Sequence, residues 1–495
     1  MAGKKKVKKG TKTTATILKL LRENIHLVVL GILITAFCVF FVLASFLRFD
    51  NFHTARFDLG NMTQTVWNTA HGRIFQLTNP NGQENVPRLA FHADFILIFF
   101  APFYWIWDSP KVLLLFQAVI TGLGGVFVYL ISVHVLKNKN ISLAFAFAYL
   151  LNPSLSWSVL FDFHSVVLAT TFLLGTIYFL LQKNYRWFLI FAILAALTKE
   201  QVWFIIALFG LLIFFWQKKR MFGFAVFSIS LLIFYLLIWQ IIPYVGASHG
   251  HFALTYFENG GDRPTELIKN TLSAPENTFA KLTDEEHTGY LKALFMPLGY
   301  LPLIFPVWLV FPIADFVLNL LSDKGELHFI YYHYTATITP FLFTSAIYAV
   351  YFLKRVIKRN IVFIVYIVTF TIYGAYTYGP LPWSLDPSLD TLESFNAPLP
   401  HKEEIKIQLA KIPTEATLAI TDNLGGYMSH RENVYLTYTE ITNADYIAFL
   451  ITKNGTDPDG EELIGILKKD TDDDFSLWYD KYGLTIFKKT NLNDQ

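Results

Sequence analysis

The amino-acid sequence predicts an α-helical polytopic membrane protein with a small soluble α/β domain at its C-terminal end. Of its 495 residues, 54% are hydrophobic and only 16% are charged, a composition that soluble domains rarely have. Long apolar runs recur from residue 25 to residue 378, many of them close to the roughly 20 residues that cross a bilayer. From about residue 386 onward the composition becomes charged and mixed.

Clusters of lysine and arginine give the predicted orientation. Segment 1–24 is basic and precedes an apolar run that is too long for a signal peptide, which predicts a retained first helix with a cytoplasmic N-terminus. The positive-inside rule places the later basic clusters in the cytoplasm as well. These clusters lie at 137–139, 182–186, 217–220 and 354–359. The first helix, about 25–47, therefore leads outward, and residues 48–92 form an outer loop.

The other apolar runs are assigned so that every basic cluster stays on the same side. Segment 93–107 is short for a span and would break this alternation, so we expect it at the outer interface or in a re-entrant position. The proline-broken segment 289–321 must then cross twice. The remaining predicted spans are 111–135, 141–153, 163–182, 187–198, 200–216, 221–243, 334–353 and 360–378. The resulting membrane domain, 25–380, has about eleven transmembrane helices and a second outer loop at 244–288.

The segment 386–495 is predicted to be an extracytoplasmic α/β domain. Short β-rich pieces such as ATLAI, NVYLTY, DYIAFLI and GLTIF alternate with helical or turn-rich stretches. The single cysteine, Cys38, excludes an intramolecular disulfide and a cysteine-based metal site. The formal net charge of +2 gives no support for a nucleic-acid partner.

Polar and ionisable residues collect at the predicted outer ends of the spans. Ionisable groups at membrane depth are costly unless they pair or line a wet cavity, so each is a functional candidate. Because several separate connections supply them, the sequence predicts one polar cavity that faces outward. The candidates are Arg56, Asp58, Arg88, His92, Asp162, His164, Lys199, Glu200 and His333.

Simpler explanations exist for the candidates in the first and third connections. Asp58 is also suited to cap the following helix, because an aspartate at that position accepts backbone N–H bonds. Lys199 and Glu200 are neighbours at the tip between two short helices, where an exposed ion pair is the simpler interpretation. Both alternatives stay open at the level of sequence.

The histidines have alternative interpretations too. His92 with Asp94, and Asp162 with His164, either orient one another or contribute to a metal site, because imidazole and carboxylate suit several divalent ions. His333 lies among tyrosines and fits an aromatic interfacial belt as well as a substrate platform. We expect no cofactor and no metal ligands, with a divalent metal as the less favoured alternative.

Five motifs resemble, in this order, domain-of-unknown-function family 2079, a prokaryotic polytopic family grouped with GT-C glycosyltransferases. They are FDLGNMTQTVWNTAHGR, RLAFHADFILIFFAPFYWIW, FDFHSVVLA, LTKEQVW and YYHYTATITPFLF. The resemblance covers nearly the whole chain after residue 45. GT-C enzymes use polyprenyl-phosphate sugars and place an acid in the first extracytoplasmic loop, so the resemblance implies this role for Asp58. Related sequences often read KED where this one reads KEQ at 199–201, so the second acid of that motif is absent.

The residue chemistry fits sugar transfer from a lipid phosphate. Asp58 is the expected general base, which takes a proton from the acceptor hydroxyl. Positive groups near the outer leaflet would stabilise the departing phosphate. The candidates for that role are Arg56, Arg88, Lys199 and His333, and the other predicted substrate-binding residues are His92, Asp162, His164 and Glu200.

The sequence therefore predicts a glycosyltransferase of the cell (plasma) membrane. Its expected partners are a polyprenyl-phosphate sugar donor, the lipid bilayer, and a glycan, lipid or protein acceptor. A transporter or flippase would also gather polar groups in a membrane cavity, but we find no inverted repeat and no charges along the middle of the spans. A non-catalytic membrane protein that needs only its exported tail is the third alternative.

Overall fold

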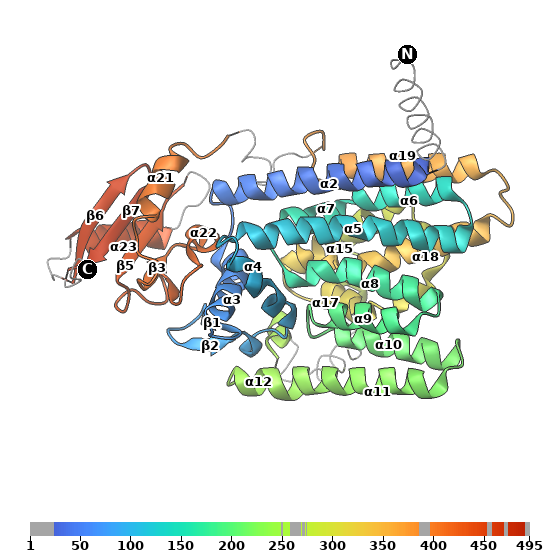
Figure 1. Cartoon of the computed structure of the whole chain (residues 1–495), viewed down its shortest axis with the longest axis horizontal. Helices are drawn as coiled ribbons and strands as arrows, with labels where there is room; N and C mark the ends of the chain where they lie inside the picture. Colours follow the sequence, from blue (N-terminus) through green and yellow to red (C-terminus); the bar gives the residue numbers. More distant parts are fainter. Residues whose placement is uncertain are drawn as a thin grey trace, which may run out of the picture.

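The computed structural model shows a helical domain with an α/β domain at one end (Figure 1). It describes residues 24–248, 251–257, 269, 273, 275–385, 397–452, 458–469 and 474–490. The basic N-terminal segment lies outside the described residues, except for Asn24. So do the first residues of the expected C-terminal domain and much of the second outer loop.

The described part of the chain contains four helices that are long and apolar enough to cross a membrane. They are α2 (Ile25–Asp50), α5 (Lys111–Leu136), the continuous run Arg220–Val245 that contains α11 (Arg220–Leu236) and α12 (Ile242–Val245), and α19 (Asn360–Tyr378). Two helices bent by 43° relative to each other form a fifth span if they are taken together. These are α6 (Lys139–Leu150) and α7 (Pro153–Leu160).

Several further apolar helices are shorter than a full span. They are α8 (Ser165–Leu181), α9 (Tyr185–Ala196), α10 (Val202–Phe215) and α18 (Thr339–Leu353). The 12 residues of α9 reach only about 18 Å at 1.5 Å per residue, against about 30 Å of hydrocarbon. Several apolar helices are thus present, whereas the number of about eleven crossings stays a prediction.

The proline-broken segment forms a series of short helices rather than two long ones. It comprises α15 (Glu285–Phe295), η6 (Met296–Leu298), α16 (Leu301–Ile304), η7 (Pro306–Val310) and α17 (Ile313–Leu321). Between α16 and η7, the ring of Phe305 stacks on Phe352 near the end of α18, with centroids 5.0 Å apart. The segment therefore extends toward the end of the bundle at which α18 ends, and then turns back. Two crossings would require such a path.

The basic connections lie together at one end of the bundle, on the right in Figure 1. Lys354 Nζ donates a hydrogen bond to the carbonyl of Leu136 at 3.2 Å, which joins the α18–α19 connection to the end of α5. Tyr185 Oη donates to Gln217 Oε1 at 2.7 Å, which joins the α8–α9 and α10–α11 connections. The predicted first outer loop and the α/β domain lie at the opposite end.

The predicted first outer loop is a compact unit. It contains η1 (Arg56–Gly60), α3 (Asn61–Ala70), β1 (Gln76–Thr78), β2 (Asn85–Pro87) and η2 (Arg88–Ala90). Segment 93–107 follows as η3 (Phe95–Phe100) and α4 (Ala101–Tyr104). These ten helical residues are too few to cross the membrane as one helix, and the position of the segment at the outer interface stays a prediction.

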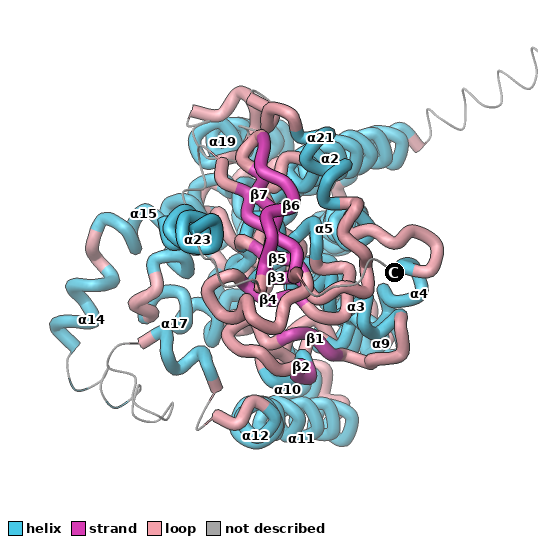
Figure 2. Tube along the Cα trace, turned by 90° about the vertical axis from the view of Figure 1, so that its left-hand side faces the viewer, coloured by secondary structure: helices cyan, strands magenta, loops and turns pink. Residues whose placement is uncertain are grey.

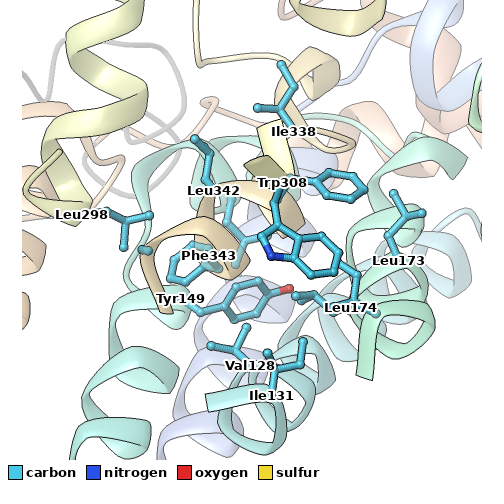
Figure 3. Close-up of a cluster of buried hydrophobic side chains, with 14 of the residues drawn as sticks. Val128, Ile131, Tyr149, Leu173, Leu174, Leu298, Trp308, Ile338, Leu342 and Phe343 are labelled. Atoms are coloured by element: carbon cyan, nitrogen blue, oxygen red, sulfur yellow. The ribbon is translucent and has the colours of Figure 1, made fainter. Parts of the chain in front are cut away.

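An apolar core holds the helical domain together (Figure 3). Side chains of α5, α6, α8 and α18 meet around Tyr149, whose ring lies edge-on to Phe343 with centroids 5.4 Å apart. The hydroxyl of Tyr149 donates to the carbonyl of Thr121 at 2.9 Å. The one polar atom of this ring is therefore satisfied inside the core.

The C-terminal domain is a five-stranded sheet in the order β4-β3-β5-β7-β6. Its strands are β3 (Leu418–Ile420), β4 (Val434–Leu436), β5 (Tyr446–Leu450), β6 (Phe475–Lys481) and β7 (Leu484–Lys489). β3 runs parallel to β4 and β5, whereas β7 is antiparallel to β5 and β6. The β-rich pieces expected from the sequence form β3, β4, β5 and β7.

Two helices cover opposite faces of this sheet, as Figure 2 shows. They are α21 (Lys402–Leu409) and α23 (Pro458–Lys469). Leu418 and Ile420 belong to the apolar cluster of α21, whereas Ala419 between them belongs to the cluster packed against α23. This alternation is the two-residue period of a strand that is buried on both faces.

The α/β domain packs directly on the loop that carries Asp58. Helix α22 (Gly425–Met428) approaches η1 so closely that a Cβ on Gly425 would collide with the backbone of Arg56. Asp422 Oδ1 accepts a hydrogen bond from the amide of Arg56 at 2.9 Å. The C-terminal domain thus helps to fix the conformation of the first outer loop.

Candidate functional site

Asp58 lies inside η1 and does not cap a helix. The N-cap of α3 is Gly60, and the side chain of Asp58 makes no capping bond. Instead, Asp162 Oδ2 accepts the amide of Ala55 at 2.7 Å and the more distant amide of Leu59 at 3.4 Å. Asp162 therefore holds the loop in place, and the capping interpretation of Asp58 is wrong.

His164 is the partner of Asp58. Its Nε2 lies 3.0 Å from Asp58 Oδ1, and its Nδ1 lies 3.0 Å from the backbone carbonyl of Asp162. A carbonyl can only accept, so Nδ1 donates, and Nε2 must also donate if Asp58 is ionised. The geometry fits an imidazolium–carboxylate pair. The Asp58 side chain is 27% exposed, and Oδ2 makes no hydrogen bond with the described residues.

His333 connects this pair to the interior of the bundle. Its ring stacks on His164 with centroids 3.8 Å apart and planes 18° apart. Burial holds the pKa of His333 well below its usual range, and the positive charges of His164 and Lys199 add to this effect. His333 is therefore neutral, and its Nδ1 has no hydrogen-bond partner among the described residues.

Glu200 contacts both predicted outer loops. Its carboxylate lies 2.9 Å from His92 Nδ1, accepts the amide of Ala93 at 3.0 Å and lies 3.6 Å from His251 Nε2. Burial disfavours the charged form, but His92, His251 and Lys199 outweigh it and hold the pKa of Glu200 well below its usual range. Burial also lowers the pKa of His92 to about 4, so a neutral imidazole donates to an ionised carboxylate.

Both arginines of the predicted site are buried and bonded to other parts of the chain. Arg88 pairs with Asp94, with Nη2 and Oδ2 3.0 Å apart. Arg56 is 0% exposed, and its Nη2 donates to Gln64 Oε1 at 2.6 Å and to the carbonyl of Thr78 at 3.3 Å. Neither guanidinium lines the cavity described next. These placements argue against a direct contact of either arginine with a phosphate.

A cavity of about 290 Å³ lies beside His333, at the connection between α9 and α10. Its polar lining includes Lys199, Glu200, His251, Asp315, Asn319, His333 and Tyr334. Lys199 makes no hydrogen bond and no ion pair within 4 Å with the described part of the chain. Burial lowers its pKa, although Glu200, Asp94 and Asp315 oppose this effect. Lys199 is therefore the cationic group of this cavity, which it lines together with the carboxylates of Glu200 and Asp315.

The predicted single cavity is confirmed only in part. Glu200 and His333 line it, but Asp58, His92 and Asp162 do not. Asp58 is linked to the cavity through His164, which stacks on His333. His92 is linked to it through Glu200.

The expected pairing of neighbouring histidines and aspartates is wrong. Asp94 binds Arg88 rather than His92, and the His164 ring contacts the carboxylate of Asp58 rather than that of Asp162. In these connections, side chains two positions apart contact different partners. In the part of the chain that the structure describes, no group of three or more His, Cys, Asp or Glu residues could hold a metal ion.

The sequence reasoning missed Asp315, Asn319 and His251 as cavity residues. Asp315 and Asn319 lie in the apolar helix α17, and an ionisable group inside an apolar segment is a functional candidate by default. That signal could have identified Asp315. His251 lies in the predicted second outer loop, where nothing in the local sequence distinguishes it.

An apolar groove adjoins the cavity. It measures about 610 Å³ and follows the outside of α10 and α11, where Phe204, Phe227 and Leu231 line it. Phe234 and Trp239 line both the groove and the cavity. The apolar surface of the two helices is therefore continuous with the cavity that holds Lys199.

Comparison with protein families gives a match over residues 48–455 to the family described as "Predicted membrane protein (DUF2079)". A crystal structure of the Archaeoglobus fulgidus oligosaccharyltransferase in the apo form is similar at 12% identity and a TM-score of 0.43, over 86% of this chain and 70% of that chain. A structure of the same organism's AglB with an inhibitory peptide and a dolichol-phosphate is similar at 13% identity and a TM-score of 0.43, over 95% and 75%. TM-scores this low do not establish a shared fold. Comparison with curated proteins gives no match.

Proposed function

The chain belongs to the DUF2079 family of predicted membrane proteins, and we propose that it is a glycosyltransferase. It moves a sugar from a polyprenyl-phosphate donor to an extracytoplasmic glycan, lipid or protein acceptor. The observation that carries the proposal is Lys199, a cation without a close partner among the described residues. It lines a cavity that shares Phe234 and Trp239 with an apolar groove on the bundle surface.

The proposed orientation follows from the two ends of the bundle. The basic connections lie in the cytoplasm, and the first outer loop and the α/β domain lie outside the plasma membrane. The hydrogen bonds of Lys354 and Tyr185 support this arrangement, because they gather four basic connections at one end. About eleven crossings, with segment 93–107 at the outer interface, complete the topology.

The donor would use both the cavity and the groove. Its phosphate binds Lys199, because an ammonium is a compact point charge that suits a phosphate oxygen. Its prenyl chain lies along Phe204, Phe227 and Leu231, where it buries apolar surface without leaving the bilayer. In the transfer step the bond between the sugar and the phosphate breaks, and Lys199 stabilises the charge that develops on the phosphate.

Asp58 is the proposed general base. Its Oδ2 takes the proton of the acceptor hydroxyl as the new glycosidic bond forms. His164 holds the other oxygen of the carboxylate at 3.0 Å, and Asp162 holds the backbone on both sides of Asp58. The neighbours of Asp58 therefore orient it and leave one oxygen available to the acceptor.

The experiment that tests the proposal is sugar transfer by the purified protein in lipid vesicles, with radiolabelled polyprenyl-phosphate sugars and a membrane extract as the source of acceptor. Asp58→Asn should lower transfer by roughly 10² to 10⁴-fold, the usual contribution of a positioned acid or base, and should leave the thermal unfolding temperature unchanged. Asp108→Asn is the matched control, because Asp108 is exposed and lies outside the site. Unchanged transfer by a folded Asp58→Asn protein would remove Asp58 from the mechanism. No transfer from any donor would contradict the proposed activity.

A further inference from the structure

A second pocket lies between the C-terminal domain and the outer end of α2. It measures about 660 Å³ and shares no lining residue with the Lys199 cavity. One wall is the segment 51–55 that leads from α2 into η1. The opposite wall contains Asp422 and Asn423, which follow β3, and Ile451 and Thr452, which follow β5. The pocket therefore joins the α/β domain to the loop that carries Asp58.

Its position in the sheet is the one where open α/β sheets bind ligands. From β3 the chain moves to β4 on one side and then to β5 on the other side of β3. The carboxyl ends of two parallel strands whose connections diverge in this way form a crevice. Asp422, Asn423 and Thr452 lie at this topological switch point.

The lining chemistry favours a neutral ligand rich in hydroxyl groups. The residues that line the pocket include the carboxylate of Asp422 and the amides of Asn51 and Asn423, but no lysine or arginine. An anion such as a nucleotide phosphate would face Asp422 without a compensating arginine or lysine. At the rim, the ring of His401 stacks on Tyr482 with centroids 4.0 Å apart, and Tyr482 remains 47% exposed. This pair offers an aromatic face beside hydrogen-bonding groups.

The backbone around the pocket is held in an unusual conformation. Four lining residues have a positive φ: Phe52 at 60°, His401 at 58°, Tyr482 at 60° and Gly483 at 78°. A positive φ is uncommon for residues other than glycine and for a bulky ring has a conformational cost. At Tyr482 and Gly483 the two-residue hairpin between β6 and β7 requires this conformation, and it places the ring of Tyr482 at the pocket.

We propose that this pocket binds a neutral saccharide. One face of a sugar ring packs against Tyr482, and its hydroxyl groups bond to Asp422, Asn423 and Thr452. The further identification of this saccharide as the acceptor rests on the proposed function. It fits the pocket wall at 51–55, which ends three residues before Asp58.

Binding is tested with the full chain in lipid nanodiscs, in the Asp58→Asn background so that turnover is slow. The probes are the methyl glycosides of glucose, mannose, galactose and N-acetylglucosamine and their short oligomers, observed by saturation-transfer NMR. Tyr482→Asn should weaken binding by about tenfold, because an aromatic contact contributes roughly 1 kcal/mol and asparagine tolerates the left-handed conformation. Tyr438→Asn is the matched control, because Tyr438 is 62% exposed in the same domain and does not line the pocket.

Thr452→Val provides an independent test if Tyr482→Asn does not fold, because it removes a hydroxyl with little change in shape. This variant should weaken the binding of the same saccharide. Binding that neither variant alters, no binding of any probe, or displacement of the saccharide by inorganic phosphate would each overturn the proposal. Saccharide binding that depends on Tyr482, without transfer from any donor, would support the pocket and contradict the glycosyltransferase. Transfer with an unchanged acceptor KM in both variants would contradict the pocket alone.

Discussion

The charged side chains at the end of the bundle that carries the predicted first outer loop fall into two groups. Arg56 and Arg88 have a partner for their guanidinium, and each holds segments of the chain together. Lys199 lies in a cavity without such a partner among the described residues, and Asp58 keeps one oxygen free of hydrogen bonds to them. All four residues look equally functional in the sequence. The comparison teaches that a charged side chain that is both buried and bonded to the chain is a positioning residue, whereas one that keeps an open polar atom is a candidate substrate contact.

The largest expected effect is the loss of protein stability when a buried, paired arginine is replaced. Arg88→Met leaves the carboxylate of Asp94 buried without its cation, and breaking a buried pair in this way costs about 3 to 5 kcal/mol. The protein should unfold at a much lower temperature in detergent. Arg88→Met combined with Asp94→Asn should recover most of the loss. If the single variant is as stable as the parent, the pair is not a structural element.

Lys199 should show the opposite pattern. Lys199→Gln removes a desolvated cation with no close partner, so the unfolding temperature should stay the same or rise, whereas binding of a polyprenyl phosphate should weaken by about 10 to 100-fold. Native mass spectrometry of lipid binding, together with thermal unfolding, measures both effects. A large loss of stability with unchanged lipid binding would make Lys199 a positioning residue, like Arg56 and Arg88.

The pH dependence of stability should report on Asp162. Burial, together with the nearby charge of Asp58, raises the pKa of Asp162 to about 7, compared with about 3.9 in an unfolded chain. The folded state then binds more protons between these values, so stability falls as the pH rises from about 4 to 7 and changes little above that. The unfolding temperature should drop by a few degrees over this range, and Asp162→Asn should remove the drop. An equal drop in the Asp162→Asn variant would show that another titratable group causes the pH dependence.

The smallest effect is expected at an exposed ion pair between the same two domains. Arg73 Nη1 lies 3.3 Å from Glu432 Oε2, with side chains 30% and 46% exposed. Exposed pairs contribute about 0 to 1 kcal/mol, so Arg73→Gln should change the unfolding temperature little. This variant removes an exposed ion pair, whereas Arg88→Met removes a buried one. Similar losses of stability in the two variants would contradict the distinction between a buried ion pair and an exposed one.

The sequence predicts elements well where a local pattern decides them. The run 111–135 corresponds to α5 (Lys111–Leu136), and the β-rich piece DYIAFLI contains β5. The basic connections likewise predict which helix ends lie together. Hydrophobic period and charge are properties of short segments, so they are visible without the fold.

The partners of the site residues are not local properties. His92 and Glu200 are 108 positions apart, and Asp58 and His164 are 106 apart. Which side chains meet is decided by the packing of whole helices and of the α/β domain. The role of Asp422, which accepts the amide of Arg56, has no signal in the sequence for the same reason.

The central claim, that the cavity of Lys199 receives a lipid phosphate, is tested most directly by a cryo-EM structure of the protein in nanodiscs that contain a polyprenyl phosphate. The account predicts phosphate density within hydrogen-bond distance of Lys199 Nζ and prenyl density along the groove of α10 and α11, next to Phe234 and Trp239. Arg88 should remain paired with Asp94 in that structure. Phosphate bound to Arg56 or Arg88 instead, with an empty cavity at Lys199, would contradict the account.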